Sequence, residues 1–129
     1  MLFGKEKEGK KILLVDDEPE IVKNLAKVLE REGYEVIYST NPKEALDLCI
    51  HKKPDLAILD IVMPEMSGPE IAMKLTEDEE FKNMPIIFLT GLLSKEEEDN
   101  IAGSIPNRTI LSKPCDKETL LRTISDKLE

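Results

Sequence analysis

The chain has 129 residues, of which 40% are hydrophobic and 35% charged, a balance that fits one folded domain and excludes a disordered polypeptide. The formal net charge of −9 argues against nonspecific binding of DNA or RNA by this domain. The two cysteines and the single histidine have no metal-binding spacing, so a zinc site is not expected.

Residues 1–9 read as a short charged tail ahead of a folded domain at residues 10–129. The tail lacks the apolar centre of a signal peptide, and no apolar run approaches the roughly 18 residues needed to span a bilayer. These features predict a cytoplasmic protein with reduced thiols and no membrane partner.

The first predicted strand is a short apolar run at residues 12–15 that ends on two carboxylates, Asp16 and Asp17. Pro19 then opens a helical pattern, and Gly33 ends it. The apolar face of this helix repeats at helical spacing and comprises Ile21, Val22, Leu25, Val28 and Leu29.

Residues 34–39 favour a second strand because they include β-branched and aromatic side chains. A helix start follows, with Asn41 as its cap, Pro42 at its first position and Glu44 completing a capping box. The Lys-Lys-Pro run at residues 52–54 closes that helix. Its buried stripe comprises Ala45, Leu46, Cys49 and Ile50.

The third predicted strand, residues 56–59, ends abruptly on Asp60. Its apolar residues are uninterrupted, as in a strand that is buried on both faces of a parallel sheet. Pro64 and Gly68 stop it from continuing. An isolated aspartate at a strand end is more often a cap or turn residue, so the rest of the chain must decide its role.

A helix at about residues 67–77 and a strand at residues 85–90, which ends on Thr90, come next. A capping box at residues 94–97 opens a weakly amphipathic helix with an acidic face. Residues 108–112 form a fifth strand that runs into Lys113. The last helix is capped by Asp116 and buries Leu120, Leu121, Ile124 and Leu128.

Five strands therefore alternate with five helices, which predicts an α/β fold: a doubly wound parallel sheet with helices on both faces. The carboxyl ends of parallel strands share one edge, so Asp16, Asp17, Asp60, Thr90 and Lys113 converge there. Each residue alone has an ordinary explanation as a cap or a solvated side chain, but the convergence of all five points to a site.

Three close carboxylates raise one another's pKa values, and a hard divalent cation such as Mg²⁺ relieves that repulsion. An amine and a hydroxyl beside such a cation suit a phosphoryl group held at the same place. A carboxylate can accept that group as an acyl phosphate.

Four motifs in order resemble the receiver domains of two-component response regulators. They are V-D-D-E at residues 15–18, D-I-V-M-P-E-M-S-G at 60–68, L-T-G at 89–91 and S-K-P at 112–114. The resemblance covers nearly the whole chain, and it implies the flavodoxin-like strand order 2-1-3-4-5.

The resemblance assigns roles to the converging residues. It implies that Asp60 accepts a phosphoryl group from a histidine kinase or a phosphotransfer protein, in signalling or in a phosphorelay. It implies that Mg²⁺ is bound by Asp16, Asp17, Asp60 and the backbone carbonyl of Val62. The phosphorylated domain would then change its partner-binding face.

Two further residues complete the switch that the resemblance implies. Thr90 would move towards the phosphoryl group, and Lys113 would pair with one of its oxygens. The Lys113–Pro114 peptide bond would be cis.

The sequence departs from the family pattern in three places. Ile110 replaces the aromatic residue of many receivers, and residues 103–108 replace the usual segment before the fifth strand; both predict an altered readout face. Val62 and Leu92 place apolar side chains two residues after Asp60 and Thr90, and this predicts slow dephosphorylation.

Other readings remain at this stage. A phosphatase with an aspartate nucleophile typically needs a second aspartate where this chain has Val62, so we expect no enzyme beyond assistance to its own phosphorylation and dephosphorylation. A flavin carrier is rejected because carboxylates occupy the loop that would bind the phosphate. The domain could instead be a static binding module, or a module cut from a larger regulator or hybrid kinase, although its ends lean towards a stand-alone receiver. We expect a monomer or a weak dimer.

Overall fold

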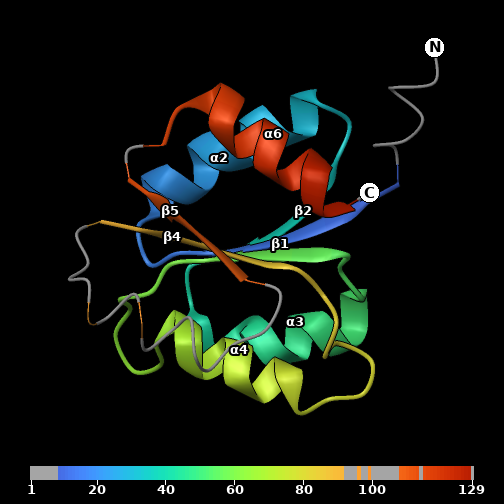
Figure 1. Cartoon of the computed structure of the whole chain (residues 1–129), viewed down its shortest axis with the longest axis vertical. Helices are drawn as coiled ribbons and strands as arrows, with labels where there is room; N and C mark the ends of the chain where they lie inside the picture. Colours follow the sequence, from blue (N-terminus) through green and yellow to red (C-terminus); the bar gives the residue numbers. More distant parts are fainter. Residues whose placement is uncertain (1–8, 92–95, 97–98, 100–107, 114, 129) are drawn as a thin grey trace.

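The computed structural model describes residues 9–91, 96, 99, 108–113 and 115–128. Its centre is a five-stranded sheet in the order β2-β1-β3-β4-β5, and every neighbouring pair is parallel (Figure 1). The strands are β1 (Lys11–Val15), β2 (Glu35–Ser39), β3 (Leu56–Leu59), β4 (Ile86–Thr90) and β5 (Arg108–Ser112). The predicted fold class and strand order are confirmed.

Helices cover both faces of the sheet. Figure 1 shows α2 (Pro19–Arg31) and α6 (Lys117–Leu128) on one face, with α3 (Ala45–Lys52) and α4 (Gly68–Thr76) on the other. A short 3₁₀ turn, η1 (Pro42–Glu44), leads into α3. This is the layer arrangement that strictly alternating strands and helices require.

The core is divided by the sheet because successive side chains of a strand point to opposite faces. In β1, Leu13 and Val15 belong to the cluster under α3 and α4, whereas Ile12 and Leu14 belong to the cluster under α2 and α6. All four residues of β3 are buried, as expected for a central strand between two helical layers. The sheet therefore holds the ends of its strands in fixed positions.

Most helix boundaries follow the predicted signals. Gly33 after α2 has a left-handed φ of 99°, and the Asp116 carboxylate accepts a hydrogen bond of 2.9 Å from the Thr119 amide at the start of α6. A reciprocal capping box between Ser67 and Glu70 opens α4; the S-x-x-E spacing carries that signal, although we did not predict it.

The predicted capping box at Asn41 is half wrong. The Asn41 side chain does accept a hydrogen bond of 3.0 Å from the Lys43 amide. The Glu44 carboxylate, however, accepts a bond of 2.6 Å from the Ser39 hydroxyl, and that hydroxyl accepts one of 3.0 Å from the Asn41 amide. A hydroxyl two residues before the cap thus takes the place that Glu44 was expected to fill.

Several predictions lie outside the described residues: the tail at residues 1–8, the capping box at 94–97 except for Glu96, Leu92, the segment at 103–107 and the peptide bond to Pro114. Glu96 and Asp99 are helical. Among the described residues, no helix combines the length and the apolar character that crossing a membrane would require.

Candidate functional site

The site begins where β1 and β3 end side by side. Val15 pairs with Leu59 in the parallel register, so Asp16 and Asp60 follow neighbouring strand ends. The Asp60 amide donates to the Val15 carbonyl at 3.0 Å. Both aspartates are buried, with 2% and 6% of their surface exposed. Two carboxylates are therefore held together in a place where charge is poorly solvated.

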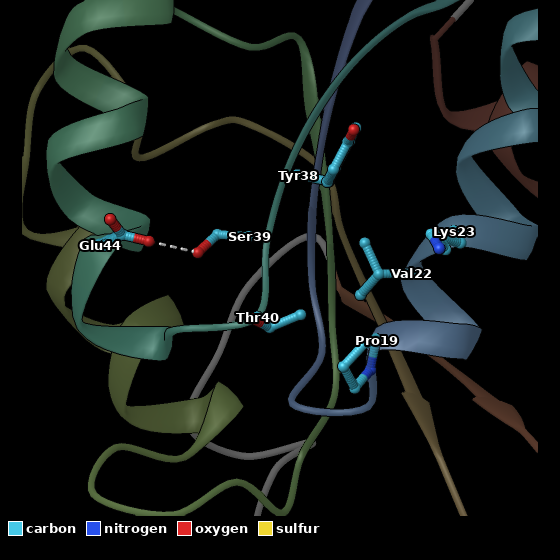
Figure 2. Close-up of a pocket in the computed structure, with 7 residues that line it drawn as sticks. All are labelled: Pro19, Val22, Lys23, Tyr38, Ser39, Thr40 and Glu44. Carbon is cyan, nitrogen blue, oxygen red and sulfur yellow. Dashed lines mark hydrogen bonds between the residues drawn. The ribbon is translucent and has the colours of Figure 1, made fainter.

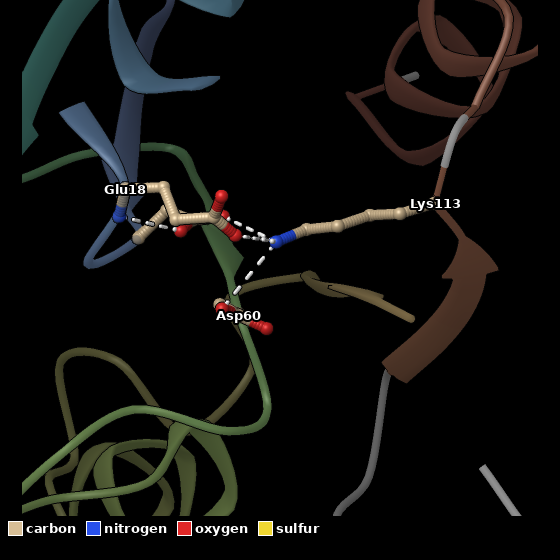
Figure 3. Close-up of polar contacts among 4 residues, drawn as sticks. Glu18, Asp60 and Lys113 are labelled. Atoms are coloured by element: carbon tan, nitrogen blue, oxygen red, sulfur yellow. Dashed lines mark hydrogen bonds and ion pairs between the residues drawn. The ribbon is translucent and has the colours of Figure 1, made fainter. Parts of the chain in front are cut away.

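Lys113 follows β5, the strand at one edge of the sheet, and its side chain extends to the two aspartates. Thr90 pairs with Ser112, and the Lys113 amide donates to the Thr90 carbonyl at 2.6 Å. The Lys113 ammonium lies 2.8 Å from Asp16 Oδ2 and 3.4 Å from Asp60 Oδ2. The ammonium donates a hydrogen bond to Asp16 and forms an ion pair with Asp60, and Figure 3 shows it directed at Asp60 and Glu18.

A hollow of about 390 Å³ opens over these groups. Thr90, which is 3% exposed, lies in its wall together with Asp60 and Lys113. The full lining comprises Asp17, Glu18, Asp60, Val62, Thr90, Gly91 and Lys113. Asp16 is not part of this lining, but its carboxylate accepts a hydrogen bond of 2.8 Å from Lys113, which is. The structure thus brings together all five residues that the strand ends were predicted to gather.

Burial and neighbouring charges change the proton affinities of these groups. Burial, and secondly the carboxylate of Asp16, raise the pKa of Asp60, while the Lys113 ammonium opposes the rise. Burial alone would lower the pKa of Lys113, but its hydrogen bonds and ion pairs with Asp16 and Asp60 outweigh burial and raise it. Lys113 therefore stays protonated at neutral pH as the counter-ion of this pair.

Three carboxylates could hold a metal ion. Within the described part of the chain, Asp16, Asp17 and Glu18 each place a carboxylate oxygen within 4.8 Å of the others. Glu18 was not among the predicted ligands, although the V-D-D-E motif contains it. Asp60 lies outside this group, and Lys113 pairs with it instead.

Val62 lines the hollow, where its carbonyl was predicted to bind the metal ion. Its backbone N–H donates to the Asp60 carboxylate, and its side chain is 71% exposed. The metal-binding role of its carbonyl stays a prediction. The slow dephosphorylation predicted from this apolar side chain also stays a prediction.

Gly68 is a structural requirement of the site that sequence reasoning treated only as a chain breaker. A Cβ atom at this position would lie 2.1 Å from the backbone carbonyl oxygen of Asp60. The Gly68 amide also donates to the Ile61 carbonyl at 3.0 Å. The start of α4 therefore packs directly against the backbone of Asp60.

A second hollow, of about 370 Å³, lies beside the first, between the start of α2 and the end of β2. In Figure 2, Pro19, Val22 and Lys23 face Tyr38 and Thr40 across it. At one end, the Ser39–Glu44 hydrogen bond supports the backbone whose carbonyl accepts from the Asp16 amide at 3.4 Å.

Ile110 lies in β5 and packs, partly buried, against the core cluster on the α3 and α4 face. Its predicted effect on the readout face is not tested by this position. It does show that an aliphatic residue fits here within the packed edge of the sheet.

The comparisons with known proteins agree on one family. The family model of the response regulator receiver domain matches residues 12–125. Protein PilH of Pseudomonas aeruginosa is 37% identical over 116 residues, which are 89% of this chain and 94% of that protein. The polar-differentiation response regulator DivK of Brucella anthropi is 34% identical over 119 residues, 92% of this chain and 96% of that protein. A crystallised Vibrio cholerae chemotaxis protein, CheY4, superposes with a TM-score of 0.84 at 32% identity, over 91% of this chain and 97% of that one.

Proposed function

The chain belongs to the response regulator receiver domain family of two-component signal transduction, and from that premise we propose that it is a phosphorylation-dependent switch. In this proposal Asp60 accepts a phosphoryl group from a histidine kinase or a phosphotransfer protein. The observation that carries the proposal is one buried carboxylate, Asp60, with an ammonium 3.4 Å away and a hydroxyl residue, Thr90, in the same hollow.

In the transfer step, a carboxylate oxygen of Asp60 forms a bond with the phosphorus atom. The bond between phosphorus and the donor nitrogen breaks, and its electron pair stays with the nitrogen. Lys113 supports this step because its ammonium already lies between Asp16 and Asp60, where negative charge accumulates on the phosphoryl oxygens. The Thr90 hydroxyl is the donor that moves towards the bound group.

The donor set fits Mg²⁺, which prefers oxygen ligands and takes one or two carboxylates together with phosphate oxygens. Asp16 and Asp17, with Glu18 beside them, offer three carboxylate oxygens within 4.8 Å of one another. When bound, Mg²⁺ would neutralise charge on the phosphoryl oxygens during transfer. The carboxylates of Asp16 and Asp17 would hold it, and Asp60 and the Val62 carbonyl would add ligands as the family resemblance implies.

We also propose that the domain is not an enzyme acting on outside phosphoesters. Val62 occupies the position where aspartate phosphatases carry a second acid, and its 71% exposed side chain offers no proton to a leaving group. Hydrolysis of its own acyl phosphate would be slow because the apolar side chain of Val62 helps little in positioning an attacking water. The signal would leave through a changed partner-binding face, as a shift between two conformations.

The experiment is intact-protein mass spectrometry after incubation with Mg²⁺ and phosphoramidate. We expect one added phosphoryl group on the wild type and none on Asp60→Asn. The matched control is Asp126→Asn, which changes an exposed aspartate of α6 and should accept phosphate like the wild type. Failure of the wild type to gain mass while folded would contradict the proposal and favour a static binding module.

A further inference from the structure

Glu18 occupies the N-cap position of α2 without capping the helix. A residue at this position normally accepts hydrogen bonds from first-turn amides, and Ser, Thr, Asp and Asn do so best. The Glu18 side chain makes no such bond, and Pro19 follows it. Its carboxylate is directed instead at the Lys113 ammonium (Figure 3), at a distance of 3.7 Å. The helix thus gains little from this side chain, which is directed to the site.

Glu18 lies at the mouth of the hollow, outside the buried aspartates. Its side chain is 62% exposed, whereas those of Asp16 and Asp60 are 3% and 7% exposed. The Asp16 carboxylate accepts a hydrogen bond of 3.0 Å from the Glu18 amide, which fixes the Glu18 backbone at the rim. Glu18 and Asp60 line the same hollow, so a phosphodonor bound there lies in the electric field of the Glu18 carboxylate.

A fixed negative charge at the mouth acts on the donor according to the donor's own charge. It repels a donor with an anionic leaving group and favours one whose leaving nitrogen is cationic. We propose that Glu18 is a specificity-determining residue that selects phosphodonors by the charge of the leaving group. This inference rests on the proposed function. Glu18 favours protonated nitrogen donors over acyl phosphates.

Two small donors separate these cases. With phosphoramidate, the Asp60 oxygen bonds to phosphorus, the P–N bond breaks, and the nitrogen, which already carries its protons, leaves as ammonia with the electron pair. With acetyl phosphate, the P–O bond breaks, and the electron pair leaves on acetate, an anion that forms close to Glu18. The same Asp60 acyl phosphate results from both.

The experiment compares the phosphorylation rates of wild type and Glu18→Gln with both donors, at saturating Mg²⁺ and low salt, by intact-protein mass spectrometry. We expect the acetyl phosphate rate, relative to the phosphoramidate rate, to rise by about fivefold in the variant, which is the size of a one-charge effect across several ångströms of water. Glu18→Lys should move the ratio further in the same direction. Added salt should shrink the effect because it screens exposed charges.

The matched control is Glu20→Gln, which removes the same charge from an exposed position in the first turn of α2 and should leave the ratio unchanged. Saturating Mg²⁺ removes differences in metal occupancy between the variants, so the ratio of the two rates reports how the site discriminates between the two leaving groups. Equal changes with both donors would overturn the inference and leave the phosphoacceptor role standing. If the wild type accepted phosphate from neither donor, the proposed function and this inference would fail together.

Discussion

The Lys113 ammonium lies 2.8 Å from the carboxylate of Asp16, although the two residues are 97 positions apart in the chain. Parallel strands make this contact possible, because β1 and β5 deliver their carboxyl ends to the same edge of the sheet. The pair leaves Asp60, 3.4 Å from the same nitrogen, as the more weakly paired of the two buried carboxylates. That carboxylate is the one we expect to react.

Lys113→Met should destabilise the metal-free protein and increase its affinity for Mg²⁺. The variant leaves Asp16 and Asp60 without their shared counter-ion, which we expect to lower the free energy of unfolding by about 3 kcal/mol. The lost positive charge no longer competes with the metal for these carboxylates, so calorimetric titration should show severalfold tighter binding. Lys23→Met, an exposed change in α2, is the control. Unchanged or weaker metal affinity would contradict the assigned position of the ammonium.

Asp60→Asn should stabilise the metal-free protein at neutral pH. Burial and Asp16 raise the pKa of Asp60 above its ordinary value of 3.8, so the native state keeps this proton to a higher pH than the unfolded chain does. Stability therefore falls as pH rises through the window that starts at the ordinary pKa and ends at the raised one.

Chemical denaturation across pH checks this prediction. We expect Asp60→Asn to gain on the order of 1 kcal/mol at pH 7, a typical size for one substitution, and the gain to vanish below about pH 4. Asp126→Asn should show no such pH-dependent gain. A destabilised Asp60→Asn variant at pH 7 would show that the Lys113 ion pair outweighs burial.

Gly68→Ala should damage the site through the backbone. The new Cβ would lie 2.1 Å from the Asp60 carbonyl oxygen, so either the start of α4 or Asp60 has to move. We expect a loss of about 3 kcal/mol in unfolding free energy, typical of overpacking against rigid backbone. Gly91→Ala is the control, because its Cβ meets no atom of the described residues within 4 Å. Equal stability of the two variants would rule out this packing contact.

Asp116→Ala should destabilise α6 in a pH-dependent way. The Thr119 amide and hydroxyl donate hydrogen bonds to the carboxylate and lower the pKa of Asp116. A lowered native pKa stabilises the protein above the ordinary value of 3.8, and this contribution disappears as pH falls through the native value. The melting temperatures of wild type and variant should therefore differ at pH 7 and converge in acid. A constant difference would assign the loss to packing.

The two cysteines should react at very different rates. Cys49 is fully buried, and burial, with a smaller effect of Asp78, raises the pKa of its thiol to about 12. Cys115 is partly exposed, and burial raises its pKa to a lesser degree. Because the thiolate is the reactive form, a thiol reagent should modify Cys115 first and Cys49 only after unfolding. Peptide mapping of the labelled protein distinguishes the sites.

The sheet and the converging residues could be predicted because each strand is a short apolar run that stops on a polar residue. The hydrogen-bond and ion-pair partners of individual side chains could not be predicted from the sequence. Glu44 was expected to return to Asn41, but the hydroxyl of Ser39 lies closer in the folded loop. Glu18 is part of the V-D-D-E motif, but the motif does not reveal its partner. The fold brings Lys113, which follows β5, to within 3.7 Å of its carboxylate. Such choices depend on tertiary distances that a linear pattern does not contain.

The contact between Gly68 and the Asp60 carbonyl also limits how this loop can change during evolution. The loop from Asp60 to Gly68 closes on itself through the hydrogen bond from the Gly68 amide to Ile61, so its length is fixed at both ends. Insertions or deletions would pull Asp60 out of place, whereas exchanges of the exposed Val62 side chain leave the backbone alone. If Asp60 is the acceptor that we propose, descendants of this chain can change the side chain at the rim while the acceptor keeps its position.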